Sequence, residues 1–340
     1  MPDLDYGYEV TIQRNATSDP SHVPTNQWQK KNAGGNWTNI SGETGATYEV
    51  REEDKAAKLR LEQDLGGTKA YSNELQVTSA DPPPVGGSGF IVIRIKNNLR
   101  VKLRYDCPSA PINVYYKFNE GDPWEYYEQV PAGMNLAWQE DFNAYFAIES
   151  TNMIWCAFYG SHSNAEFDVL PESDFSMMTE LNNFMRDCKK FDGDLSWMDI
   201  PLCTNLDYAF YNCNSISGEQ YLNFATPALT TMEQCFGNLN PSQQLTTGNW
   251  DLSNWDTSKV RKMGWAFRGL INFNNDSITG WDTSNVTNMD GMFLDCLNFN
   301  QHLRGWCVQK IPTEPSGYLS NFAENSALTD FNKPLWGQPC

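Results

Sequence analysis

Hydrophobic and polar residues alternate along the first segment of the chain, and such alternation is typical of β-strands with one buried face. Trp28 stands in the run NQWQKK, and Leu59 and Leu61 alternate with charged residues in AKLRLEQD. Gly34–Gly35 separate two of these runs and favour a hairpin turn. The pattern predicts an N-terminal β-sandwich over residues 1–80.

The alternation breaks at DPPPVGGSG, residues 81–89, and resumes beyond it. Three prolines followed by small residues cannot continue a strand, so this stretch predicts a linker. The runs GFIVIRIKNNLRVKLRYD and INVYYKFNEGDPWEYYEQV then predict strand pairs that turn at KNN and NEGDP. We expect a second, small antiparallel β-sandwich over residues 90–172.

From residue 173 onward the dominant pattern is a repeat. Phenylalanines preceded by an apolar residue recur with spacings of 26, 26, 31, 26 and 29 residues, at Phe184, Phe210, Phe236, Phe267, Phe293 and Phe322. A period in the twenties is typical of stacked repeats. Residues 173–340 are therefore predicted to form a solenoid in which each phenylalanine lies on that of the next repeat.

The repeat WDTSNVTNMDGMF indicates the local structure that we expect. Val286, Met289 and Phe293 have the i, i+3, i+7 spacing of one helical face. The Asp-Thr-Ser sequence at 282–284 contains good helix N-cap residues. The segment after Phe293 is rich in Asn, Gly and Gln and favours a short strand. The prediction is one short helix and one short strand per repeat.

The units WDTSKVRKMGWAF and WDTSNVTNMDGMF, within residues 251–306, share the pattern W-D-T-S-x-V-x-x-M-x-x-M/A-F followed by an F-N segment. Residues 176–250 keep this pattern loosely, and residues 307–340 look like a degenerate cap. The repeats over 176–340 resemble those of the BspA-like leucine-rich-repeat surface proteins. The resemblance implies a right-handed solenoid that is displayed on a surface and used in adhesion.

A second resemblance covers most of residues 1–80. Trp28, Gly34–Gly35, Trp37, the G-x-T-x-x-T-Y stretch at 42–48 and the stretch ending in KLR at 54–60 follow one another in this order. This order is similar to that of bacterial and phage immunoglobulin-like modules. The resemblance implies a spacer, a display unit or a weak adhesion unit.

Charge and hydropathy exclude several classes of partner. The chain has 340 residues and a formal net charge of −18, which disfavours binding to nucleic acid and to anionic membrane surfaces. No stretch approaches 18 apolar residues, and the start MPDLDYGYEVTIQRN lacks the basic region and apolar core of a secretory signal peptide. We expect no nucleic-acid partner, no membrane insertion and no signal peptide.

Residues that could bind a metal or catalyse a reaction form no recognisable motif. Nine cysteines without CxxC spacing favour buried, reduced thiols, with disulfides as the alternative. His22, His162 and His302 have no ligand at metal spacing, and Asp192 and Asp194 lack the other ligands of a calcium loop, so a turn role is favoured. We expect no metal, no cofactor and no enzymatic activity.

Two groups of residues are candidates for binding. Tyr115, Trp124 and Tyr126 lie on one predicted hairpin, where alternate side chains point to opposite faces, so that some can be exposed for a glycan or protein and others buried.

The second group differs between copies of the repeat. Lys259, Arg261 and Lys262 replace Asn285, Thr287 and Asn288 of the following copy, and we expect these positions to point outward.

These observations lead to a non-enzymatic binding protein displayed on a surface. The apparent lack of a signal peptide, the phage-type module and the predicted reduced thiols favour a bacteriophage virion component, which decorates a capsid or belongs to a tail or fibre. Its expected partners are other virion or surface proteins, a host-surface glycan or protein, or a second copy of the chain. A bacterial cell-surface adhesin is the alternative, and a polysaccharide-degrading enzyme is a weaker one.

Overall fold

The computed structural model describes residues 9–11, 25–31, 36–44, 47–49, 58–64, 69–71, 75–76, 89–238 and 248–340. The chain divides into two compact units, Met1–Pro82 and Pro83–Cys340. It is mainly β, with several antiparallel sheets and no α-helix among the described residues. The predicted turn at Gly34–Gly35 and the predicted linker, apart from Gly89, lie outside the described residues.

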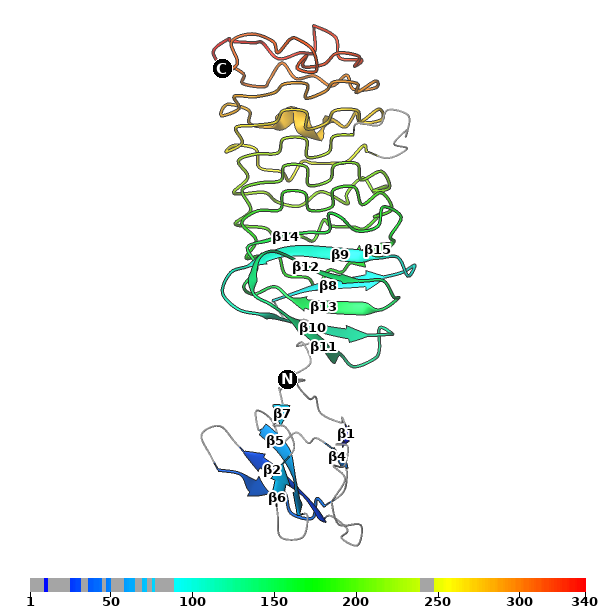
Figure 1. Ribbon diagram of the computed structural model, residues 1–340. Coiled ribbons are helices and arrows are strands. Elements are labelled where there is room, and N and C mark those ends of the chain that lie inside the picture. The colour runs from blue at the N-terminus through cyan, green and yellow to red at the C-terminus, as the bar shows by residue number, and fades with distance from the viewer. Residues whose placement is uncertain are drawn as a thin grey trace. The chain divides into compact units, whose positions relative to one another are not determined.

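The first unit contains two antiparallel sheets (Figure 1). One pairs β1 (Glu9–Thr11) with β4 (Thr47–Glu49). The other has the order β3-β2-β5-β6, with β7 beside β5. Its strands are β2 (Thr25–Lys31), β3 (Thr38–Asn39), β5 (Lys58–Asp64), β6 (Lys69–Tyr71) and β7 (Leu75–Gln76). Trp28 lies opposite Leu61 in this sheet, and both side chains are buried, so the alternation around them does mark a core face.

The second unit begins with two further antiparallel sheets. One has the order β11-β10-β13-β8-β15 and the other the order β12-β9-β14. Their strands are β8 (Phe90–Ile95), β9 (Val101–Cys107), β10 (Ile112–Lys117), β11 (Glu125–Val130), β12 (Gly133–Glu140), β13 (Tyr145–Glu149), β14 (Trp155–Ala157) and β15 (Phe167–Val169). In β9 every second side chain is buried, as the alternation requires. These buried residues belong to one core that continues into the repeats.

The repeats follow β14 and coil back and forth in layers that stack on the sheets (Figure 1). We call residues 155–340 the repeat stack. Single parallel β-bridges join each layer to the next, through Trp155, Glu180, Asn205, Thr231, Lys262 and Asn288. Backbone bonds reinforce them, for example from the Phe236 N–H to the Ala266 carbonyl at 2.9 Å. Each layer therefore depends on hydrogen bonds to its neighbours.

The core phenylalanines form a column through the repeat stack, as expected from their spacing. The rings of Phe210, Phe236, Phe267 and Phe293 stack almost parallel, with successive centroids 5.8, 5.3 and 5.4 Å apart. Phe184, which precedes this run, contacts its neighbour edge-on. The column buries its rings completely, which makes it the main apolar contact between layers.

The predicted solenoid of leucine-rich-repeat type, with a short helix and a short strand per repeat, is wrong. Within the described part of the chain the repeats contain no α-helix, and their only helical element is the short 3₁₀ helix η2 (Asp276–Gly280). Apart from β14 and β15, all described strands precede the repeats. The β-pairing between one described layer of the repeats and the next consists of single bridges. The repeats are turns and extended segments, without the closed helix-and-strand solenoid.

Backbone conformation explains why no helix follows the WDTS sequence. Trp265 and Gly291, two residues before Phe267 and Phe293, both have φ of 54°. A left-handed residue cannot lie inside a right-handed helix, so the chain reverses between Met289 and Phe293. Both of these side chains are still buried. The i, i+3, i+7 pattern therefore arises from successive turns that face one core.

Candidate functional site

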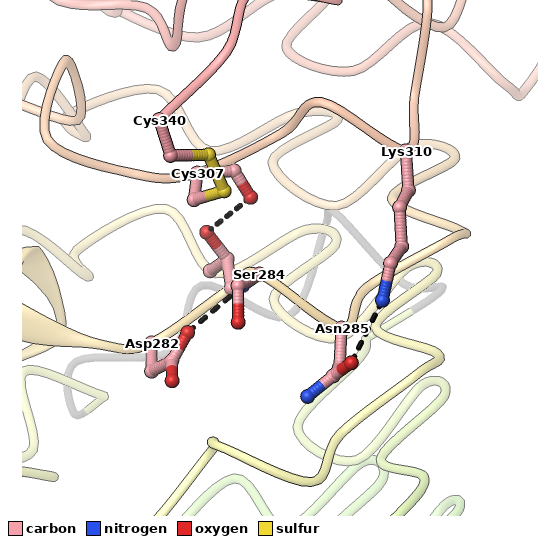
Figure 2. The surroundings of a disulfide bond; sticks show 7 residues. Asp282, Ser284, Asn285, Cys307, Lys310 and Cys340 are labelled. Atoms are coloured by element: carbon pink, nitrogen blue, oxygen red, sulfur yellow. Dashed lines mark hydrogen bonds between the residues drawn. A yellow bond between two sulfur atoms is a disulfide. The ribbon is translucent and has the colours of Figure 1, made fainter.

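The repeated Trp-Asp-Thr-Ser motif is used to build the fold. Thr283 is 1% exposed, and its hydroxyl donates to the Cys307 carbonyl in the next repeat at 3.0 Å. The Asp282 carboxylate accepts the Ser284 N–H at 2.9 Å and thereby closes a local turn (Figure 2). The Trp281 and Trp306 side chains are buried. Packing of the tryptophans and hydrogen bonds within the protein thus account for the repetition of the motif.

The hairpin β10–β11 places its aromatic residues on two faces. Tyr115 is 5% exposed and packs edge-on against Phe90 and Tyr126, at centroid distances of 5.8 and 6.0 Å. Trp124 and Tyr126 are half-buried. The Lys117 ammonium lies 4.7 Å from the Trp124 ring centroid, a cation–π contact. Among the three predicted binding residues, Tyr115 therefore belongs to the interior, and a binding role for Trp124 and Tyr126 stays a prediction.

The opposite face of this hairpin carries an aromatic patch at the margin of the core, which consists of the exposed Phe118 and the half-buried Tyr116, Tyr127 and Phe142. Phe118 is 60% exposed, and its ring centroid lies 5.4 Å from that of Tyr116 and 6.3 Å from that of Phe142. Phe142 in turn contacts Tyr127 at 6.2 Å. The patch combines side chains from β10, β11 and the β12–β13 loop, so the sheet fixes its shape.

Two carboxylates border the aromatic patch. The Tyr116 hydroxyl donates to Glu125 Oε2 at 2.9 Å, and the Tyr127 hydroxyl donates to Glu140 Oε1 at 2.6 Å. Burial, together with the Glu140 hydrogen bond and charge, raises the pKa of Tyr127 far above its usual value. Tyr127 therefore stays neutral at physiological pH, and the patch presents apolar rings beside hydrogen-bond acceptors.

The three basic residues predicted as a binding group are exposed on the repeat stack. Lys259 Nζ donates to the Pro227 carbonyl at 2.8 Å, and Lys262 Nζ lies 3.8 Å from Glu233 Oε2. Burial raises the pKa of Glu233, and the Lys262 charge opposes this rise. Two of the three cations are thus engaged with their own protein, and the structure favours the aromatic patch over them as the main candidate site.

The cysteines fall into two classes. Seven are buried thiols: Cys107, Cys156, Cys188, Cys203, Cys213, Cys235 and Cys296. Burial raises the pKa of Cys203 to about 12 and raises the pKa of Cys296 as well, so these two thiols stay protonated at neutral pH. Cys307 and Cys340 form a disulfide at the end of the repeat stack, the alternative to the favoured reduced state (Figure 2).

The described residues include no group of three His, Cys, Asp or Glu side chains placed to hold a metal ion. Asp194 accepts the Ser196 N–H at 2.9 Å, and Asp192 accepts the Ser217 N–H at 2.7 Å. Asp194 thus makes the turn contact that was favoured from the sequence, whereas Asp192 accepts from a residue 25 positions further along the chain, in the next layer. In the same part of the chain, no helix has the length and apolar character needed to span a membrane.

The repeat stack is the part of the chain that a known family model matches. A family described as "Mycoplasma protein of unknown function, DUF285" matches residues 157–250 and again residues 240–333, together more than half of the chain. The chain belongs to this family. The two consecutive DUF285 matches agree with the repetition of the layers. Searches of curated proteins and of solved structures each return no significant match.

Membership in the DUF285 family leaves one expectation open. The family is described as a Mycoplasma protein of unknown function, and none of the comparisons tests the expectation of a bacteriophage virion component, which stays a prediction. The matches leave residues 1–156 uncovered, and these contain the aromatic patch. The patch is therefore a feature of this chain's sheets outside the matched DUF285 repeats.

Sequence reasoning missed Phe118 and Phe142 as members of the patch. Phe118 follows directly on β10 and comes just before the predicted turn NEGDP, where a large apolar residue has few neighbours to cover it. Its place directly before a turn was therefore the sequence feature that could have indicated an exposed ring. Phe142 had no comparable signal, because only the packing of the β12–β13 loop brings it to Phe118.

Proposed function

We propose that this chain is a non-enzymatic attachment protein that binds a glycan through its aromatic patch. The observation that carries the proposal is the 60% exposed Phe118 ring, which contacts the rings of Tyr116 and Phe142 directly after the end of β10. Exposing such a ring to water is unfavourable unless a partner covers it. The apolar faces of sugar rings stack on aromatic side chains of this kind.

The polar border of the patch supports a glycan over a purely apolar partner. Glu125 and Glu140 lie beside the rings and can accept hydrogen bonds from sugar hydroxyls in addition to those from Tyr116 and Tyr127. A few polar groups beside apolar contact area are the usual composition of small-ligand sites. In this proposal Phe118 supplies stacking and the two carboxylates supply orientation.

We further propose that the protein acts on the outside of a bacterial cell, the alternative considered from the sequence. The Cys307–Cys340 disulfide supports this place, because disulfides persist in oxidising surroundings and are rare in the cytosol. The Mycoplasma description of the family also supports a cellular origin. The formal net charge of −18 favours a neutral or cationic partner over nucleic acid.

The test is a glycan-binding screen with the purified full chain, followed by titration of the best ligand against Phe118→Ala. Loss of the ring should weaken binding about tenfold, the usual effect of removing a central aromatic contact. Phe331→Ala is the matched control, since Phe331 is 70% exposed and lies in the C-terminal part of the repeat stack. Equal loss in both variants, or no effect of Phe118→Ala, contradicts the proposal. Shortening of the glycan during the assay would identify an enzyme instead.

A further inference from the structure

A groove of about 250 Å³ lies where the three-stranded sheet meets the first layer of the repeat stack. It is separate from the aromatic patch and shares no residue with it. The residues that line it include one aromatic ring, one aliphatic side chain and four polar side chains: Trp155, Ile154, Asp106, Thr179, Glu180 and Asn182. Its volume lies just below the range of about 300–1,000 Å³ of most small-ligand pockets, so it fits a single small group.

The β-ladder determines which side chains face the groove together. Trp155 pairs with Asp106 of β9 on one side and bridges to Glu180 of the repeat stack on the other. Residues directly opposite one another in a ladder project from the same face, about 5 Å apart. The indole of Trp155 is therefore flanked by a carboxylate on each side.

The floor of the groove is held rigidly. The Ile154 carbonyl accepts the Thr179 N–H at 2.9 Å and the Thr179 hydroxyl at 3.2 Å. The Trp155 indole N–H donates to the Asn182 carbonyl at 3.0 Å, which fixes the ring against the first layer. These bonds fix Thr179 and the Trp155 ring, so the aromatic side of the groove is preformed for a ligand.

Asn182 also lines the groove. Its side-chain oxygen Oδ1 has no donor among the described residues, but the atom is itself buried, so a ligand in the groove has no access to it. The acceptors that the groove presents beside the aromatic ring are therefore the carboxylates of Asp106 and Glu180.

We propose that this groove binds a primary ammonium group. An ammonium has three N–H donors and no acceptor, which matches the carboxylates of Asp106 and Glu180 on either side of the ring. The positive charge also favours the Trp155 ring through a cation–π contact. The excess of acidic over basic residues in the chain favours the approach of such a cation.

A primary ammonium can belong to a lysine side chain of a partner protein or to an amino sugar. Nα-acetyl-lysine amide and methyl glucosaminide represent the two sources. Nα-acetyl-norleucine amide and methyl N-acetylglucosaminide are neutral analogues of nearly the same shape. We expect at least one of the amines to bind and to shift the NMR signal of the Trp155 indole N–H, whereas both neutral analogues leave it in place. The amine that binds more tightly identifies the source.

Glu180→Gln should weaken the binding of the amine about tenfold, because it removes one charge and keeps the shape. Glu180 is exposed, so the variant should fold normally. Glu172→Gln, at another exposed glutamate in the same unit, is the matched control and should bind as the unaltered chain does. Phe118→Ala should also leave amine binding unchanged, which separates this site from the glycan proposal.

Three outcomes would overturn the proposal. Equal binding of an amine and its neutral analogue would show that the charge is not recognised. Equal affinity of Glu180→Gln and the unaltered chain would place the amine elsewhere. Failure of both amines to shift the Trp155 signal at tens of millimolar would show that the groove takes no ammonium.

Discussion

At the residue scale, the two best-matched repeats carry residues of very different size at one equivalent position. Trp265 and Gly291 occupy the same left-handed position in consecutive layers. The Trp265 indole lies over Gly291 and donates to the Leu319 carbonyl at 2.6 Å, so it reaches across the intervening layer. A Cβ at Gly291 would lie 2.5 Å from Trp265 Cδ1, and hence a large residue in one copy requires the smallest one in the next.

Gly291→Ala should therefore lower the free energy of unfolding by about 1–3 kcal/mol, through backbone strain at positive φ and displacement of Trp265. Urea unfolding followed by tryptophan fluorescence measures the change. Gly305→Ala is the control, because no atom lies within 4 Å of the added Cβ and its φ lies outside the left-handed region. A loss at Gly291 no greater than at Gly305 would contradict this account of the position.

At the element scale, each layer is joined to the next by hydroxyls as well as by backbone groups. Thr257 and Thr283 are buried, and each donates to a carbonyl in the following layer at 3.0 Å. Thr287 makes a similar bond to the Arg261 carbonyl at 3.1 Å, but it is exposed to water. Water can replace the exposed bond and cannot replace the buried ones, so the buried threonines stabilise the stack more.

Thr283→Val keeps the shape of the side chain and removes its hydroxyl. We expect it to lower the free energy of unfolding by about 1–2 kcal/mol, because the Cys307 carbonyl loses a buried partner. Thr287→Val should change it by less than about 0.5 kcal/mol. Chemical unfolding of both variants gives the comparison, and equal effects would mean that burial of the bond is unimportant.

The sequence predicted the layers and the phenylalanine column but not the elements within a layer. The i, i+3, i+7 pattern of Val286, Met289 and Phe293 fits a helix and also fits successive turns around one core. The backbone at one position decides between them. In the preceding copy this position is Trp265, whose φ of 54° excludes a helix, yet tryptophan carries no sequence signal for a left-handed backbone. The local sequence pattern therefore predicted which side chains are buried, whereas tertiary packing determined the backbone conformation.

The hairpin residues were only partly predictable for a similar reason. Alternation predicts that Val114 and Tyr115 face opposite sides, but both are buried. β10 itself keeps its alternation, because its pairing with β13 shows no register shift. Val114 belongs to the core cluster and Tyr115 lies on the other face of the sheet, where neighbouring rings cover it. The register shift between β10 and β11 places one extra residue, Tyr127, in β11. The exposed ring is Phe118, a position that was not predicted.

At the scale of the second unit, the two ends of the repeat stack are closed by different means. The sheet β12-β9-β14 covers the first layer through the Trp155–Glu180 bridge. In the last layer, the N–H groups of Ser320 and Phe322 donate to carbonyls of their own layer. The Cys307–Cys340 disulfide then ties the chain end to this layer. Both closures remove unpaired backbone edges to which another chain could add.

Removal of the disulfide should weaken the C-terminal closure. The bond spans 33 residues in sequence, and closing a loop of that length is worth about 3–4 kcal/mol on the chain-entropy model. The double variant Cys307→Ser, Cys340→Ser should melt several degrees below the unaltered chain in calorimetry. Addition of a reductant should bring the unaltered chain to the same midpoint and leave the variant unchanged. Identical midpoints without reductant would contradict a stabilising role.

The single bridges between layers have a consequence for how such a chain can change in length. Every bridge joins equivalent positions of adjacent copies, so a whole copy inserted between Asn205 and Asn288 would meet its neighbours through contacts that already exist. Each insertion would move the disulfide-tied end about 4.8 Å away from the groove at Trp155. Duplication within the gene would thus lengthen the protein in small, equal steps and leave both candidate binding sites intact.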